Sequence, residues 1–336
     1  MNSAVQLYAT TLLVYLAVNL IASWALDIQF GVTGVLNFGF ILFQSAGAYT
    51  AALLSLGPAR SSGGFQEYLG GWQLPFPLPI VGAMVVGAIL GWLVGWVGLR
   101  RLRGDFQAVV LLVVSVVATL VVESLPGFLN GDAGLSLVPK PLLGLAGMTG
   151  VPYAWAFVGF SIAVCGLVAL LVARLVHSPY GRVLRAVREN DALADAMGRS
   201  STRARMEVFV LGGALAALSG ALLVEFTTAW APSGWLYPET FVYFTIVIIG
   251  GRGSLPGVAV GAALIAVAIQ QAVQLFPIGA DATVLASLQW VVIGLLTLGF
   301  LWWRPQGLIP ERVRRFGPAA GGVPPGIADV QERVGP

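Results

Sequence analysis

The chain has 336 residues, of which 57% are hydrophobic and only 10% charged, and its mean hydropathy is +0.87. A soluble domain carries about a quarter of its residues as charged side chains, so this composition excludes a globular soluble protein and predicts an integral membrane protein. One cysteine, Cys165, and one histidine, His177, cannot form a disulfide or a Cys/His zinc site. We expect no metal, catalytic or nucleic-acid site in the chain.

Nine apolar stretches are each close to the roughly 20 residues that cross a bilayer as a helix. In chain order they are 4–26, 31–56, 78–99, 105–129, 153–176, 206–228, 238–250, 255–276 and 284–303. The seventh is short and ends in glycine, which favours a broken or re-entrant element packed inside protein. We predict an all-α, polytopic membrane helical bundle of about nine spans, within a range of eight to ten, over residues 1–308. Residues 309–336 are predicted to form a disordered cytoplasmic tail.

Small residues recur at every fourth position within two of these stretches. The two runs are Gly87, Gly91 and Gly95, and Gly212, Ala216 and Gly220. Such faces let helix backbones approach closely where no hydrophobic effect drives association in lipid. The runs therefore predict tight helix packing and not a ligand site.

The basic residues are distributed unevenly between the two sides that nine spans define. Sixteen of the eighteen Lys and Arg residues follow odd-numbered spans, and only Arg60 and Lys140 lie on the other side. Cytoplasmic loops carry an excess of Lys and Arg. We therefore expect an external N-terminus and a cytoplasmic C-terminus.

Polar side chains inside the apolar stretches are candidates for a transport pathway, because they are costly in lipid. Glu123 lies in the outer part of the fourth stretch, and Asn37, Gln44 and Gln107 either line a pathway or hydrogen-bond neighbouring helices. No intramembrane series of Asp, Glu or His resembles a proton relay. This disfavours an ion-coupled secondary transporter, which remains an alternative.

The chain lacks the motifs of nucleotide-binding and hydrolytic sites. The segment GGRGSLPG at 250–257 is glycine-rich but has no Gly-Lys-Ser/Thr to hold phosphates and magnesium. No GxSxG or HExxH motif occurs either. The clusters are arginines with scattered acids, which also disfavours a membrane-embedded lipid enzyme.

The polar loop at 178–205 is too charged to insert and is patterned as an amphipathic helix. Val183, Val187, Ala194 and Met197 share one stripe with Asn190 in its middle, whereas most charged residues occupy the other side, and Gly198 ends the helix. Physical chemistry leaves two interpretations open: a helix on the membrane surface, or a docking helix for a cytoplasmic partner.

Four segments together resemble the permease subunits of branched-chain amino acid ABC importers, in particular those of the LivM type. The first, at 31–54, is punctuated by glycines and contains Gly-Ala-Tyr at 47–49. The third, SPYGRVLRAVREND followed by ALADAMG, is similar to the cytoplasmic coupling loop of that family. The others are LRRLRGDFQAVVLL at 99–112 with GDAGLSLVP at 131–139, and GGRGSLPGVAVGA at 250–262 with RPQGL at 304–308.

The resemblance implies a non-catalytic transport subunit of the bacterial inner membrane. Its partners would be a second, LivH-like permease, two cytoplasmic ATPase subunits that bind ATP and magnesium, an external substrate-binding protein contacting loops 130–152 and 229–237, and membrane lipid. No cofactor is expected on this chain. By resemblance, the surface that contacts the ATPase comprises Arg182, Arg185, Arg188, Glu189, Asp191 and Gly198.

Departures from the family pattern bear on the cargo. Phe40 stands where a histidine is common, and Phe106 and Gln107 stand where the family has Tyr-Phe. The resemblance implies branched-chain or related amino acids, with urea, short amides and small carboxylates as alternatives. Import is implied by the resemblance alone.

Overall fold

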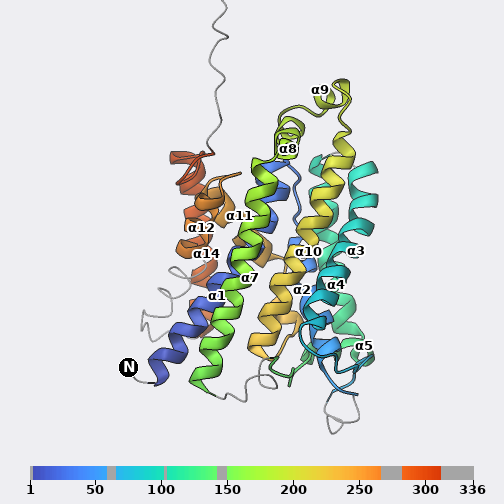
Figure 1. Ribbon diagram of the computed structural model, residues 1–336, viewed down its shortest axis with the longest axis vertical. Helices are drawn as coiled ribbons and strands as arrows, with labels where there is room; N and C mark the ends of the chain where they lie inside the picture. The colour runs from blue at the N-terminus through green and yellow to red at the C-terminus, as the bar shows by residue number, and fades with distance from the viewer. Residues whose placement is uncertain (1–2, 59–65, 102–103, 142–149, 266–281, 312–336) are drawn as a thin grey trace, which may run out of the picture.

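The computed structural model describes residues 3–58, 66–101, 104–141, 150–265 and 282–311 (Figure 1). These residues form helices joined by loops, and among them β-pairing is limited to two isolated bridges, Tyr68 with Leu129 and Leu135 with Trp230. Helices satisfy their own backbone hydrogen bonds, as an apolar chain in lipid requires. The predicted polytopic helical bundle is therefore confirmed.

Six helices form the main body of the bundle. They are α1 Ser3–Asp27, which continues into the π-helix η1 Ile28–Val32, α2 Phe40–Ser55, α3 Leu78–Arg101, α4 Gly104–Ser124, α7 Val151–His177 and α10 Ser201–Thr227. All except α2 are long and apolar enough to cross a membrane, so five candidate spans occur within the described residues. The count of nine spans and the orientation of the termini stay predictions.

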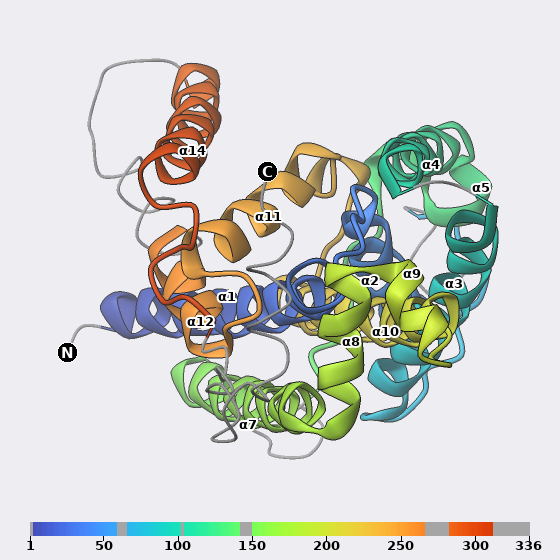
Figure 2. The same ribbon diagram turned by 90° about the horizontal axis from the view of Figure 1, so that it is seen from above.

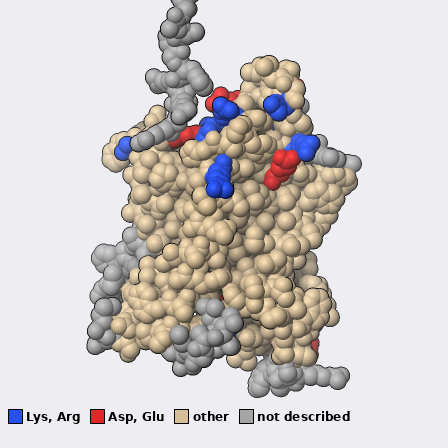
Figure 3. Space-filling model, in the orientation of Figure 1, with Lys and Arg blue, Asp and Glu red and all other residues tan. Residues whose placement is uncertain are grey.

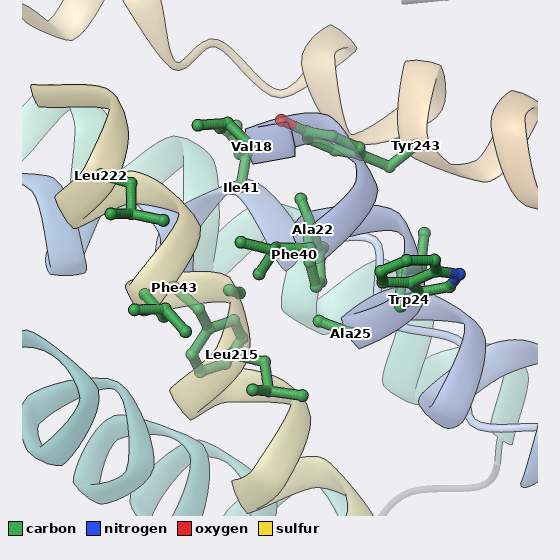
Figure 4. Packing of buried hydrophobic residues seen from close by; sticks show 14 of the residues in the cluster. Val18, Ala22, Trp24, Ala25, Phe40, Ile41, Phe43, Leu215, Leu222 and Tyr243 are labelled. Atoms are coloured by element: carbon green, nitrogen blue, oxygen red, sulfur yellow. The ribbon is translucent and has the colours of Figure 1, made fainter. Parts of the chain in front are cut away.

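The centre of the bundle is α10, which packs against α1, α2 and α3 (Figure 2). Figure 4 shows side chains from α1, α2, α10 and α11 meeting in this core. Aromatic rings pack edge to face in it. The ring centres of Phe43 and Phe209 lie 5.6 Å apart, and those of Phe40 and Tyr243 lie 5.5 Å apart. Such edge-to-face pairs favour one packing over alternatives.

Glycines permit the close approach of α10 to its neighbours. A Cβ on Gly220 would lie 1.8 Å from the backbone oxygen of Gln44, and one on Gly87 would lie 2.4 Å from the Cβ of Ala217. The predicted packing role of both small-residue faces is confirmed, because a side chain at either position would clash with a neighbouring helix.

The C-terminal part of the chain contains two shorter helices and one of 22 residues. These are α11 Pro238–Gly250, α12 Leu255–Ala262 and α14 Ala282–Trp303, and α11 packs against α12. Helix α11 is continuous to Gly250, and the next residue, Gly251, has a φ of +120°, which suits glycine. The re-entrant character of the seventh stretch stays a prediction. The second half of the predicted eighth stretch, 266–276, lies outside the described residues.

The two ends of the bundle differ in charge. One end carries α8 Pro179–Glu189 and α9 Asp191–Ala196, and Figure 3 shows Lys and Arg gathered there above an almost uncharged belt. We call it the basic end. The opposite end carries the short helices α5 Pro126–Leu129, η3 Gly131–Ala133 and η4 Pro232–Gly234. Large apolar side chains are exposed along α3, α4 and α7 between the two ends, as expected of surface in contact with lipid.

Candidate transport pathway and coupling surface

A cavity of about 440 Å³ enters the bundle from the end opposite the basic end. Its rim comes from loops at 133–136 and 229–234, which are held together because Leu135 and Trp230 exchange two backbone hydrogen bonds of 2.8 Å. The floor comes from α1, α2, α10 and α11, including Asn19, Gln44, Glu239 and Tyr243. The loops expected to contact a binding protein therefore form the mouth of this cavity.

Gln44 is the predicted pathway residue that lines the cavity. Its Oε1 accepts a hydrogen bond of 3.0 Å from the Tyr243 hydroxyl, and its Nε2 has no partner among the described residues. Thr240, one helical turn before Tyr243, accepts a 3.2 Å hydrogen bond from the backbone N–H of Ile41. Helices α2 and α11 are thus joined by polar contacts beside the buried amide nitrogen of Gln44, which is unpartnered within the described part of the chain.

The other predicted pathway residues lie outside the lining of this cavity. Asn37 donates to Gln29 of η1 at 3.0 Å, and Gln29 donates to the backbone oxygen of Phe209 at 3.2 Å, so Gln29 connects η1 to α10 and Asn37 holds Gln29 in place. Gln107 is buried in α4 with its Nε2 unpartnered among the described residues, and Glu123 is half-buried near the end of α4. Their assignment to a pathway stays a prediction.

The polar loop differs from the single amphipathic helix predicted for it. Asn190 adopts an extended conformation and divides the loop into α8 and α9, and its side chain accepts a 3.0 Å hydrogen bond from the N–H of Leu193, capping α9. Val187 and Ala194 are buried as predicted, but Met197 is 76% exposed. The predicted end is confirmed, since α9 is followed by Gly198 with a φ of +77°.

The six predicted coupling residues separate into two groups. Arg182, Glu189 and Gly198 are exposed at the basic end. Arg185 and Arg188 instead point toward the chain itself, because both form ion pairs with Glu311, and Asp191 is paired with Arg205 at the start of α10. The second group therefore positions α8 and α9 on the bundle.

Glu311 belongs to an ion-pair cluster that joins four segments. Arg188 pairs with Glu311 at 3.0 Å and also donates to the backbone oxygen of Gly31. Buried Asp27, at the end of α1, accepts a 2.8 Å hydrogen bond from the N–H of Gly253. The cluster therefore connects α1 and η1, α8, the turn after α11 and the C-terminal segment.

Backbone contacts support the same junction. Leu308 and Ile309 donate to the backbone oxygens of Ile249 and Gly250 at 2.7 and 3.0 Å. GGRGSLPG and RPQGL, which are far apart in the sequence, thus pack together, and the first residues of the predicted tail at 309–336 are ordered on the bundle. Residues 312–336 lie outside the described residues.

Sequence reasoning missed Asp27 and Glu311. Asp27 directly follows the first apolar stretch, where a solvated carboxylate at the membrane interface is the ordinary expectation. Glu311 lies beyond the last stretch, in the predicted tail. The available signal was the excess of arginine at this end, because several arginines packed on apolar helices require acidic partners.

One ionisable group in α8 and one in α9 have shifted pKa values. Hydrogen bonds from the N–H and the hydroxyl of Ser201, each 2.8 Å long, hold the pKa of Asp195 below its ordinary value. Burial, together with a 2.6 Å hydrogen bond to Glu207, raises the pKa of the Tyr180 phenol. Both contacts tie the loop to α10.

Residues 8–301 match the family model described as the branched-chain amino acid transport system permease component. The chain is 28% identical, over 90% of its length and 93% of the relative, to a protein of Methanocaldococcus jannaschii named probable branched-chain amino acid transport permease protein LivM. It is 29% identical to the LivM permease protein of Escherichia coli K12, over 90% of this chain and 69% of the relative.

The related LivH permease protein of Escherichia coli K12 is 25% identical over 71% of this chain and 76% of its own length. No solved structure matches the chain. The family model covers most of the bundle, including the cavity floor, α8, α9 and the turn after α11. The chain therefore belongs to the family of permease components of branched-chain amino acid transport systems.

Proposed function

We propose that the chain is a transmembrane permease subunit of an ABC importer in a bacterial inner membrane. It would form half of the translocation pathway for branched-chain or related amino acids. The observation that carries this proposal is the family match over residues 8–301, together with relatives whose names describe LivM and LivH permease proteins. A second, LivH-like permease would complete the pathway.

The exposed residues of α8 and α9 support docking of ATPase subunits at the basic end. Arg182 and Glu189 present both charges on a surface that the bundle does not use. ATP and magnesium would be bound by the ATPases, because this chain carries no nucleotide-binding motif. Closure of the ATPase pair would then displace α8 and α9, and this displacement would shift the helices that they contact, α7 and α10.

The cavity supports delivery of solute from the other end. Its mouth consists of the paired loops at 133–136 and 229–234, and its floor reaches Gln44 and Tyr243. An external binding protein would release its amino acid into this mouth. Rigid-body tilting of the two permeases would then expose the pathway to the opposite side.

The test is transport by a reconstituted assembly. The tagged chain is purified in mild detergent, co-purifying subunits are identified by mass spectrometry, and the assembly is placed in liposomes with its binding protein. Leucine uptake should require ATP, the binding protein and a catalytically intact ATPase. Uptake by this chain alone, driven by an ion gradient, would replace the proposal with a secondary transporter. ATP-driven uptake of urea or a short amide in preference to leucine would keep the mechanism and change the cargo.

A further inference from the structure

A second pocket, of about 370 Å³, lies at the end opposite the basic end and is separate from the cavity described above. It is enclosed by the end of α2, the segment leading into α3, the loop at 139–141 and the last turn of α10. None of its lining residues lines the first cavity. Its volume lies within the range of small-molecule sites.

Glu225 of α10 supplies the negative group of this pocket. It is only 1% exposed, and neither carboxylate oxygen has a hydrogen-bond partner among the described residues. A buried carboxylate without a partner is strongly unfavourable. Four of the nine lining residues are prolines, which have no backbone N–H to donate, so the wall itself offers little compensation.

Lys140 supplies a positive group to the same pocket. It is exposed, and its ammonium lies 5.4 Å from the centre of the Tyr153 ring. Among the described residues no ion pair joins Lys140 to Glu225. The two opposite charges therefore share one pocket without neutralising each other directly.

The remaining wall is apolar. Leu74 and Phe76 contribute apolar side chains to the lining, and the Phe76 ring makes an edge contact with the ring of Phe160, with 5.1 Å between the ring centres. An anion, a separate cation and an apolar wall match the three parts of an apolar α-amino acid: its ammonium, its carboxylate and its side chain.

We propose that this pocket binds an apolar amino acid as a zwitterion, with its ammonium at Glu225, its carboxylate at Lys140 and its side chain against Phe76. The choice of an amino acid rests on the proposed function. The site would hold solute beside the external mouth and not within the first cavity. Two charge-assisted contacts would give selectivity for molecules that carry both charges.

The test is equilibrium binding to the purified full-length chain, without ATPases or binding protein. The probes are leucine, 3-methylbutylamine, which lacks the carboxylate, and 4-methylpentanoate, which lacks the ammonium. Leucine should bind the native chain at least tenfold more tightly than either analogue. Glu225→Gln should weaken leucine and the amine by about ten- to a hundredfold and leave the carboxylate analogue unchanged. Lys140→Met should weaken binding of leucine and of the carboxylate analogue and leave binding of the amine unchanged.

Controls separate the site from loss of folding. Lys140→Arg should retain leucine binding, and so should Glu67→Gln, which neutralises an exposed carboxylate outside the pocket. Unchanged leucine affinity in Glu225→Gln, as expected if the carboxyl group is simply protonated, would overturn the proposal. ATP-driven leucine uptake by the assembly without such binding would remove this site and leave the proposed function standing. Binding lost in both variants would support the site whatever solute the assembly transports.

Discussion

The Arg188 guanidinium lies 3.0 Å from the Glu311 carboxylate and also donates to the backbone oxygen of Gly31. This arrangement links α8 to the start of the C-terminal segment and to η1, which continues α1. Displacement of α8 by a partner would therefore act directly on α1, which contributes to the floor of the cavity. The ion pair therefore connects the basic end, through η1, to the helix that lines part of the cavity floor.

Reversal of one charge in this pair should both destabilise the chain and abolish uptake. Arg188→Glu places two carboxylates together near buried Asp27, and we expect a loss of about 1–3 kcal/mol, measured as a lower Tm of the purified chain. Combining Arg188→Glu with Glu311→Arg should restore much of the stability. If Arg188 acts only by contacting an ATPase, the single variant will keep its native Tm, and the double variant will not regain uptake.

The exposed charges of α8 should behave differently. Arg182→Glu and Glu189→Lys are expected to leave the Tm unchanged and to weaken retention of the ATPases by roughly threefold to tenfold, more at low salt, because exposed ion pairs are weak and screened. Co-purification at two ionic strengths measures this effect. Arg182→Lys, which keeps the charge, is the control, and full retention in both reversed variants would contradict docking at this surface.

Acid should loosen the connection between α9 and α10. The folded pKa of Asp195 is lowered by the bonds from Ser201, so their stabilisation is complete above the unfolded pKa of about 3.9 and disappears as the pH falls through the lower folded value. The protection of the Ser201 N–H against hydrogen exchange, relative to an unstructured amide at the same pH, should fall over that interval. Asp195→Asn should remove this pH dependence of the protection. The same dependence of protection on pH in that variant would show that Asp195 is not the group responsible.

The sequence predicted those parts of the fold that depend on local pattern. Hydropathy located the long helices, and glycine spacing located the faces that pack around α10, because lipid and close packing act on single helices. Asn190 was misassigned because asparagine fits a helical wheel as well as it caps a new helix. Glu311 and Asp27 were missed because their roles depend on contacts with Arg188 and Gly253, which are distant in the sequence.

Glycine substitutions test the packing directly. Gly220→Ala should destabilise the chain by about 1–3 kcal/mol, because its Cβ would overlap the backbone oxygen of Gln44. Gly166→Ala, in the middle of α7 where a Cβ meets nothing within 4 Å, should change stability by no more than about 1 kcal/mol. Thermal unfolding of both variants in the same detergent gives the comparison, and equal losses would show that close approach is not the cause.

Two buried glutamines distinguish the pathway from general packing. Gln44 and Gln107 are 1% and 5% exposed and each has an unpartnered Nε2 among the described residues, but only Gln44 lines the cavity. Gln44→Leu removes a polar group from the cavity lining and leaves the Tyr243 hydroxyl without its acceptor, which costs about 1–3 kcal/mol. Because the altered group lines the cavity, uptake should fall about tenfold or more. Gln107→Leu should transport at the native rate. Uptake is measured in liposomes that contain equal amounts of assembled complex. Equal losses of uptake in both variants would assign Gln44 to helix packing and not to the pathway.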